Sequence, residues 1–187
     1  MITQTMICHP KTPAPFIHSL HVHVTYQAQF GLRLYYDVKG DLAQLKCPST
    51  QPSQAVDGLW QHTCFEVFIA IPNDDRYYEF NFSPSTEWAG YAFSDYRTRQ
   101  TADYVPQTPT LKITQAAECL QLEAFISADD LPLLAGLSPQ TNLQLGLSAV
   151  IEAQAGTLSY WALQHPDAQP NFHHRDSFMS LDLLNKS

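Results

Sequence analysis

Short apolar segments, alternating with polar residues and separated by turn residues, are the feature that most constrains what this chain can fold into. Alternation with a period of two is typical of strands that bury one face. Residues 20–26 show it clearly, with Leu20, Val22 and Val24 on one side. We therefore predict an all-β sandwich of about nine or more antiparallel strands. The expected strands span residues 20–26, 32–38, 63–71, 76–82, 88–96, 111–115, 119–127, 143–152, 159–164 and 178–184.

The segments between these strands contain almost no helical pattern. Only residues 129–134 suggest a helical turn, for which Asp129 is the expected cap. Residues 48–57 are rich in Pro, Ser and Gln, and we interpret them as a long loop rather than a domain boundary. A chain of 187 residues can bury one substantial core. We therefore expect residues 1–187 to form a single domain.

Charge and composition argue against several classes of partner. The net charge is -8, and only ten Lys and Arg residues are scattered along the chain, so neither nucleic acid nor an anionic membrane is expected. Residues 1–15 contain no apolar run suited to a signal peptide, and no stretch is long enough to span a membrane. Four cysteines without a disulfide spacing fit free thiols. We expect a soluble, cytoplasmic protein, and the sequence indicates no oligomeric state.

The hairpin formed by residues 63–82 has a register that its turn fixes. If residues 72–75 close a four-residue loop, Ile71 pairs with Arg76 and Val67 faces Phe80. One face of the hairpin is then almost wholly apolar, so it is expected to face the core. This predicted core face carries Phe65, Val67, Ile69, Ile71, Tyr78, Phe80 and Phe82.

The opposite face of the hairpin mixes acidic, amide and aromatic side chains, namely Cys64, Glu66, Phe68, Tyr77, Glu79 and Asn81. In the expected register Glu66 lies across from Asn81 and diagonal to Glu79. Such a mixture suits a sugar, because polar groups bind its hydroxyls and flat rings cover its apolar face. A solvated face without a ligand is the alternative. A glycoside hydrolase that uses both Glu side chains is a further one.

Other candidate residues carry weaker signals. His21 and His23 share a strand face, but no third ligand is identifiable, so no metal site is expected. The adjacent His173 and His174 lie in an expected loop that they could anchor. A Trp side chain is more often part of a core than a binding platform, and Trp60 is expected near a sheet edge.

Several short motifs together resemble the DOMON-like domains of bacteria and the related family-nine carbohydrate-binding modules. The motifs are LWQHTCFEVFI (59–69), YYEFNFSPS (77–85), WAGYAFSDYR (88–97), SYWALQHP (159–166), NFH (171–173) and DSF (176–178). They are spread over most of the chain from Leu32 onwards. The resemblance implies an immunoglobulin-like or jelly-roll β-sandwich that binds a sugar or, in cytochrome members, b-type haem.

The resemblance also implies roles for individual residues. Trp60 and Trp161 would clamp a sugar, while Glu66, Asn81 and Arg97 would bind its hydroxyls. In the haem-binding relatives the iron ligands are typically Met and His. Here Met occurs only at positions 1, 6 and 179, none in a central expected strand. A haem domain would therefore draw an axial ligand from His62, His165 or His173.

We expect a non-catalytic module that binds a small carbohydrate and carries no cofactor. A b-type haem domain is the first alternative, and a glycoside hydrolase is the second. The expected ligand-binding residues are Trp60, Glu66, Glu79, Asn81, Arg97, Trp161, His165 and His173.

Overall fold

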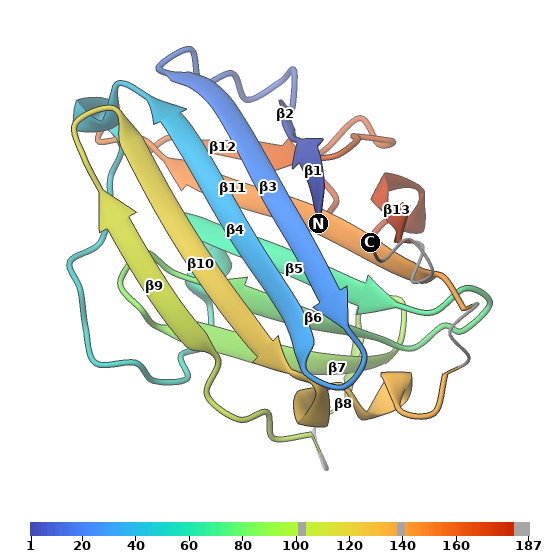
Figure 1. The fold of residues 1–187 in the computed structure, drawn as a ribbon. Coiled ribbons are helices and arrows are strands. Elements are labelled where there is room, and N and C mark those ends of the chain that lie inside the picture. Colours follow the sequence, from blue (N-terminus) through green and yellow to red (C-terminus); the bar gives the residue numbers. More distant parts are fainter. Residues whose placement is uncertain (101–103, 138–140, 182–187) are drawn as a thin grey trace.

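The computed structural model describes residues 1–100, 104–137 and 141–181 (Figure 1). Within these ranges the chain forms thirteen β-strands and five 3-10 helices of three residues each. The strands are β1 (Ile2–Thr5), β2 (Ile7–Cys8), β3 (Ile17–Gln27), β4 (Gly31–Gly40), β5 (Cys64–Ala70), β6 (Tyr77–Phe82), β7 (Trp88–Asp95), β8 (Thr98–Gln100), β9 (Thr110–Gln115), β10 (Cys119–Ser127), β11 (Leu143–Glu152), β12 (Leu158–Ala162) and β13 (Met179–Leu181). The predicted all-β class is confirmed.

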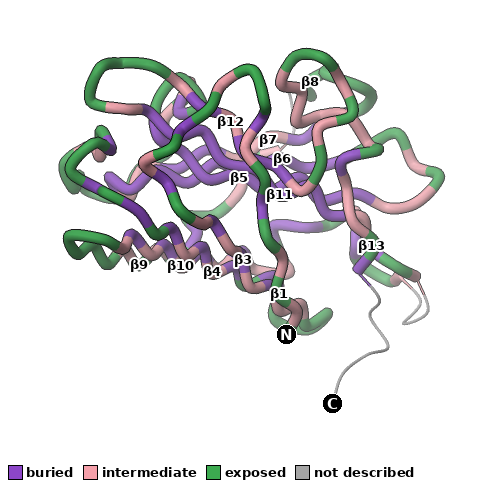
Figure 2. Tube along the Cα trace, turned by 90° about the horizontal axis from the view of Figure 1, so that it is seen from above, coloured by how far each residue is buried: buried purple, intermediate pink, exposed green. Residues whose placement is uncertain are grey.

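Two sheets lie face to face and enclose the core (Figure 2). The five-stranded sheet has the order β1-β3-β4-β10-β9, and the eight-stranded sheet has the order β2-β12-β11-β5-β6-β7-β8, with β13 also paired to β11. All the named strand pairs are antiparallel. The predicted antiparallel sandwich is therefore confirmed.

The first eight residues join the two sheets at one edge. β1 pairs with β3 in one sheet, and β2 pairs with β12 in the other. Met6 lies between these two strands and is 2% exposed. The sequence did not predict β1, β2 or β8, because strands of two to four residues are too short to show an alternating pattern.

The predicted helical turn at residues 129–134 consists of two 3-10 helices, η3 (Ala128–Asp130) and η4 (Pro132–Leu134). The prediction that Asp129 caps this turn is wrong. The side chain of Ser127, the last residue of β10, accepts a hydrogen bond from the backbone N–H of Asp129 and caps η3 instead. The other 3-10 helices are η1 (Leu42–Gln44), η2 (Leu59–Gln61) and η5 (Arg175–Ser177). Residues 48–57 contain no helix or strand, as the loop prediction required.

The predicted register of the β5–β6 hairpin is confirmed. Val67 lies opposite Phe80, and Glu66 lies opposite Asn81. Six of the seven residues predicted for the core face are buried in the main core, and Ile71 is partly buried against it. The period-two pattern therefore fixed both the pairing and the inward face of these strands.

The outer face of the same hairpin is covered, so the alternative of a solvated face is wrong. Glu66, Glu79 and Asn81 are at most 5% exposed. The segment after β12 folds back over this face, where Phe172 and Phe178 pack on a small apolar cluster that includes Phe68. The polar side chains therefore lie beneath a loop rather than in open solvent.

Gly146 in β11 lets this segment approach the sheet. A Cβ atom built at Gly146 would lie 2.5 Å from Cε1 of Phe178, which is shorter than van der Waals contact allows. β13 continues from this segment and pairs with residues 143–145 of β11, while β12 pairs with residues 148–152 of the same strand. The glycine thus allows the covering segment to lie flat on the sheet.

The described part of the chain contains no helix that is long and apolar enough to cross a membrane. The structure describes all four cysteines as free thiols, and Cys64 is buried.

Candidate functional site

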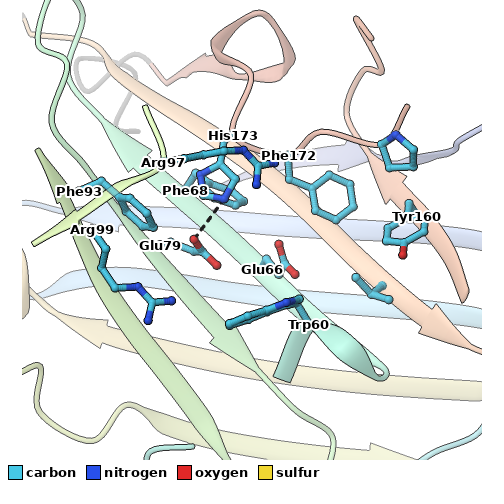
Figure 3. Close-up of a pocket in the computed structure, with 12 residues that line it drawn as sticks. Trp60, Glu66, Phe68, Glu79, Phe93, Arg97, Arg99, Tyr160, Phe172 and His173 are labelled. Atoms are coloured by element: carbon cyan, nitrogen blue, oxygen red, sulfur yellow. Dashed lines mark ion pairs between the residues drawn. The ribbon is translucent and has the colours of Figure 1, made fainter. Parts of the chain in front are cut away.

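A cavity of about 360 Å³ opens on the outer face of the eight-stranded sheet (Figure 3). Strands β5, β6, β11 and β12 contribute its sheet side, while η2, the β7–β8 hairpin and residues 170–173 contribute its walls. Its volume falls in the range of small-molecule sites. The lining residues are Trp60, Glu66, Phe68, Glu79, Phe93, Arg97, Arg99, Val150, Tyr160, Pro170, Phe172 and His173.

Two buried carboxyl groups, Glu66 on β5 and Glu79 on β6, project into the cavity (Figure 3). Oε2 of Glu66 accepts a hydrogen bond from the Ser148 hydroxyl at 3.3 Å, and Oε1 of Glu79 accepts one from Nδ2 of Asn81 at 2.8 Å. Burial, and then the neighbouring Glu79, raise the pKa of Glu66 well above its usual value. Burial raises the pKa of Glu79 to about 7. Both carboxyls are therefore largely uncharged in mildly acidic solution.

His173 faces Glu79 as a neutral imidazole. The hydroxyl of Tyr77 accepts a hydrogen bond from the backbone N–H of Arg97 at 3.0 Å, so it can donate its own proton to Nδ1 of His173 at 2.7 Å. The proton of the imidazole is then on Nε2, which lies 3.7 Å from Oε2 of Glu79. Burial, followed by the charges of Arg97 and Arg99, lowers the pKa of His173 to about 3. The contact with Glu79 is therefore not an ion pair near neutral pH.

Trp60 supplies an accessible aromatic ring at the cavity. It lies in η2, which begins after Gly58 in the left-handed conformation (φ 81°), and it is 37% exposed. Its ring meets that of Tyr91 edge-on, with 6.2 Å between ring centres. Four further rings line the cavity, those of Phe68, Phe93, Tyr160 and Phe172. These aromatic surfaces complement the two carboxyls.

Two arginines from the β7–β8 hairpin line the same cavity. Nη2 of Arg97 donates to Oδ1 of Asn171 at 3.1 Å. The guanidinium of Arg99 lies 3.7 Å above the centre of the Tyr91 ring, and its Nη1 is 3.5 Å from Oδ1 of Asp57. The Tyr91 hydroxyl donates to the same carboxylate. Both guanidinium groups are thus positioned by neighbours before any ligand arrives.

The structure brings five of the expected ligand-binding residues into one cavity, namely Trp60, Glu66, Glu79, Arg97 and His173. Asn81 does not line the cavity. It lies fully buried behind Glu79 and orients that carboxyl through its amide, while its own Oδ1 has no hydrogen-bond partner among the described residues. Its role is therefore to position Glu79.

Trp161 and His165 lie elsewhere. Trp161 is 7% exposed and belongs to the core between the sheets, where its Nε1 donates to the Ser159 hydroxyl. The expected clamp of Trp60 and Trp161 is thus not formed. The preceding residue, Tyr160, points to the cavity because successive strand residues alternate in direction. His165 lies near the N-terminal strands, with Nε2 2.9 Å from the backbone oxygen of Ile7.

Sequence reasoning missed Arg99, Tyr160 and Phe172. Arg99 lies in a three-residue exposed strand that has no apolar pattern. The direction of the Tyr160 side chain depends on which face of β12 meets the core. The run Ser-Tyr-Trp-Ala-Leu fits either face. Among the described residues no group of three His, Cys, Asp or Glu side chains is arranged to hold a metal ion.

Comparison with known proteins adds evidence on the fold. No model of a known protein family matches the chain, and no curated protein matches it. Solved structures share its fold. One of them is a protein from Bacteroides uniformis, provisionally described as carbohydrate-binding, and it superposes with a TM-score of 0.67 at 14% sequence identity. The match covers 97% of this chain and 85% of the other. The β-sandwich therefore has a counterpart in an experimental structure.

Proposed function

We propose that this protein is a non-catalytic binding module for a small sugar, which it holds in the cavity over β5 and β6. The observation that carries the proposal is the combination of an accessible Trp60 ring with two buried carboxyls, Glu66 and Glu79, in a cavity of about 360 Å³. The description of the structural neighbour from Bacteroides uniformis as a carbohydrate-binding protein agrees with this proposal.

The chemistry of the cavity suits a sugar ring. The face of a pyranose is apolar and can stack on the indole of Trp60, while its hydroxyls meet groups that can donate or accept. A protonated carboxyl does both, so Glu66 and Glu79 can each make paired hydrogen bonds with a ring hydroxyl. These bonds form in a buried site, away from bulk water. A buried polar group without a partner costs free energy, so a ligand that leaves one unpaired binds more weakly.

Titration calorimetry with a panel of mono- and disaccharides tests this proposal. We expect at least one sugar to bind the wild-type protein, and Trp60→Ala to weaken that binding roughly tenfold, which corresponds to about 1.4 kcal/mol of lost contact. Phe30→Ala is the matched control, because Phe30 is an exposed aromatic residue in the β3–β4 turn, away from the cavity. Unchanged affinity in Trp60→Ala, or a panel without any binding sugar, would show that the proposal is wrong.

The hydrolase alternative is supported by one observation, which is that Glu66 and Glu79 share the cavity. An assay for reducing ends released from the bound disaccharides checks it in the same samples. The haem alternative gains no comparable support. No Met is among the described residues that line the cavity, and of the three candidate axial ligands, His62, His165 and His173, the cavity lining includes His173 alone among the described residues.

A further inference from the structure

The cavity contains two guanidinium groups whose hydrogen-bonding capacity is only partly used. Arg97 donates through Nε and Nη2 to Tyr96 and Asn171, and its Nη1 has no partner among the described residues. Arg99 contacts Asp57 through Nη1 alone, so its Nε and Nη2 are equally without a partner in the described chain. In a protein with only ten Lys and Arg residues, this local concentration of unused donors points to an acceptor on the ligand.

The charges around the cavity favour an anion. Arg97 forms no ion pair with a carboxylate among the described residues, whereas Arg99 is 3.5 Å from Asp57. The two carboxyls inside the cavity are buried without a charged partner, which suppresses their own charge. The fields of both arginines also reach the interior, because they lower the pKa of His173 and oppose the rise in the pKa of Glu79. With the carboxyls protonated, the lining groups carry a net positive charge.

We propose that the sugar bound in this cavity carries a carboxylate, as a hexuronic acid does, and that the guanidinium groups of Arg97 and Arg99 bind this carboxylate. The inference rests on the proposed function and deepens it by naming the class of sugar. A guanidinium presents parallel N–H donors that match the two oxygens of a carboxylate, and such charge-assisted bonds are stronger than bonds between neutral groups. The ring hydroxyls would face Glu66 and Glu79.

A sugar with a free amino group fits the same site poorly. Its ammonium would satisfy the two carboxyls, but it would have to share the cavity with two guanidinium charges. A neutral sugar would leave the unused donors of Arg97 and Arg99 to water. A sugar with a carboxylate can bind both the two guanidinium groups and the two carboxyls of the cavity.

This assignment also predicts a dependence on pH through Glu79. The charged or titratable groups around Glu79 come from every element packed against it. They are Cys64 and Glu66 on β5, Tyr77 on β6, Tyr91 on β7, Arg97 in the β7–β8 turn, Arg99 on β8, Asp57 before η2 and His173 after β12. Glu79 ionises near pH 7, and its negative charge then opposes a second carboxylate in the cavity. We therefore expect uronate affinity to fall as the pH rises from 6 to 8.

Calorimetry with glucuronate and glucose tests the inference, because these two sugars differ only in a carboxylate at C6. At pH 6 we expect the wild-type protein to bind glucuronate at least tenfold more tightly than glucose. Arg97→Gln and Arg99→Gln should each lower the ratio of glucuronate affinity to glucose affinity at least threefold. Arg33→Gln is the matched control, because Arg33 lies on β4 of the other sheet and pairs with Glu123. It should keep the full preference.

The possible outcomes separate the two proposals. Equal or tighter binding of glucose overturns the uronate assignment and leaves the sugar-binding function standing. The same holds if glucosamine or glucose 6-phosphate binds more tightly than glucuronate, since each names another class of sugar. A preference that survives in both arginine variants also overturns the assignment. If no sugar of any class binds, the proposed function fails, and the uronate assignment fails with it.

Discussion

Glu79 is a carboxyl that the fold buries against its own preference for water, and this has a measurable cost. Its pKa is about 7 in the folded protein, compared with a usual value of 4.5. The folded state therefore holds the proton more tightly than the unfolded state, and the free energy of unfolding falls as the pH rises from about 4.5 to about 7. A shift of this size corresponds to roughly 3 kcal/mol at most.

We expect Glu79→Gln to stabilise the protein at pH 8 by up to about 3 kcal/mol and to have little effect at pH 4, because glutamine resembles the protonated carboxyl. Urea unfolding at both pH values measures the difference. Glu118→Gln, at an exposed position in the β9–β10 turn, is the control and should change stability by less than about 0.5 kcal/mol. Equal effects of Glu79→Gln at pH 4 and pH 8 would contradict the assigned pKa.

The residues of the site differ in how far the sequence could reveal them. The alternating pattern predicted that Glu66 and Glu79 point away from the core, because their strands have one clearly apolar side. The same argument could not decide which of Tyr160 and Trp161 faces the core. Both are large aromatic residues, and β12 lacks a clear apolar side. Burial of the carboxyls was also beyond prediction, because it depends on a segment about 90 residues further along the chain.

At the scale of elements, β11 and the segment that follows β12 depend on one another. Gly146 leaves room for the Phe178 ring, and this contact holds the covering segment close to the outer face of the sheet. Glycine to alanine in an extended strand is otherwise mildly stabilising, because alanine restricts the unfolded chain. A loss of stability at this position would therefore report the contact with Phe178.

We expect Gly146→Ala to lower the free energy of unfolding by about 1–3 kcal/mol, as overpacking does. The same substitution in a Phe178→Ala background should cost much less, because the ring that it displaces is gone. A double-mutant cycle by urea unfolding measures this coupling. Additive effects would mean that the two residues do not interact in solution.

The elements also differ in how well the sequence pattern predicts their bounds and their place in the fold. Strands β10 and β11 have the predicted bounds, because long alternating or apolar runs end at clear turn residues. The covering segment has no repeating pattern at all, and its place on the sheet is set by contacts between residues distant in sequence. The predicted last strand is confirmed in part as β13, and its final residues, 182–184, lie outside the described part.

At the scale of the whole molecule, stability and binding reside on opposite sides of one sheet. The main core lies between the two sheets, and the cavity lies on the far side of the eight-stranded sheet. Leu122 on β10 is fully buried in that core. Loss of its side chain should therefore affect folding without altering the cavity.

We expect Leu122→Ala to lower the free energy of unfolding by about 2–5 kcal/mol and to leave sugar affinity unchanged under conditions where the protein is folded. Thr114→Ala, on the exposed face of the neighbouring strand β9, should have a small effect on both properties. Urea unfolding and calorimetry on the same samples provide the two measurements. A large loss of affinity in Leu122→Ala would show that core and cavity are coupled.

The position of the covering segment has a consequence for the growing chain. The N-terminus of a chain leaves the ribosome first, so β5 and β6 emerge long before residues 170–178 are made. Until then residues 170–178 cannot cover Glu66 and Glu79, so burial by this segment cannot raise the pKa of either carboxyl. The binding cavity, with its uncharged carboxyls, is therefore complete only after residues 170–173 have been made. A chain that stops before Pro170 would lack Pro170, Phe172 and His173 and therefore a complete site for its ligand.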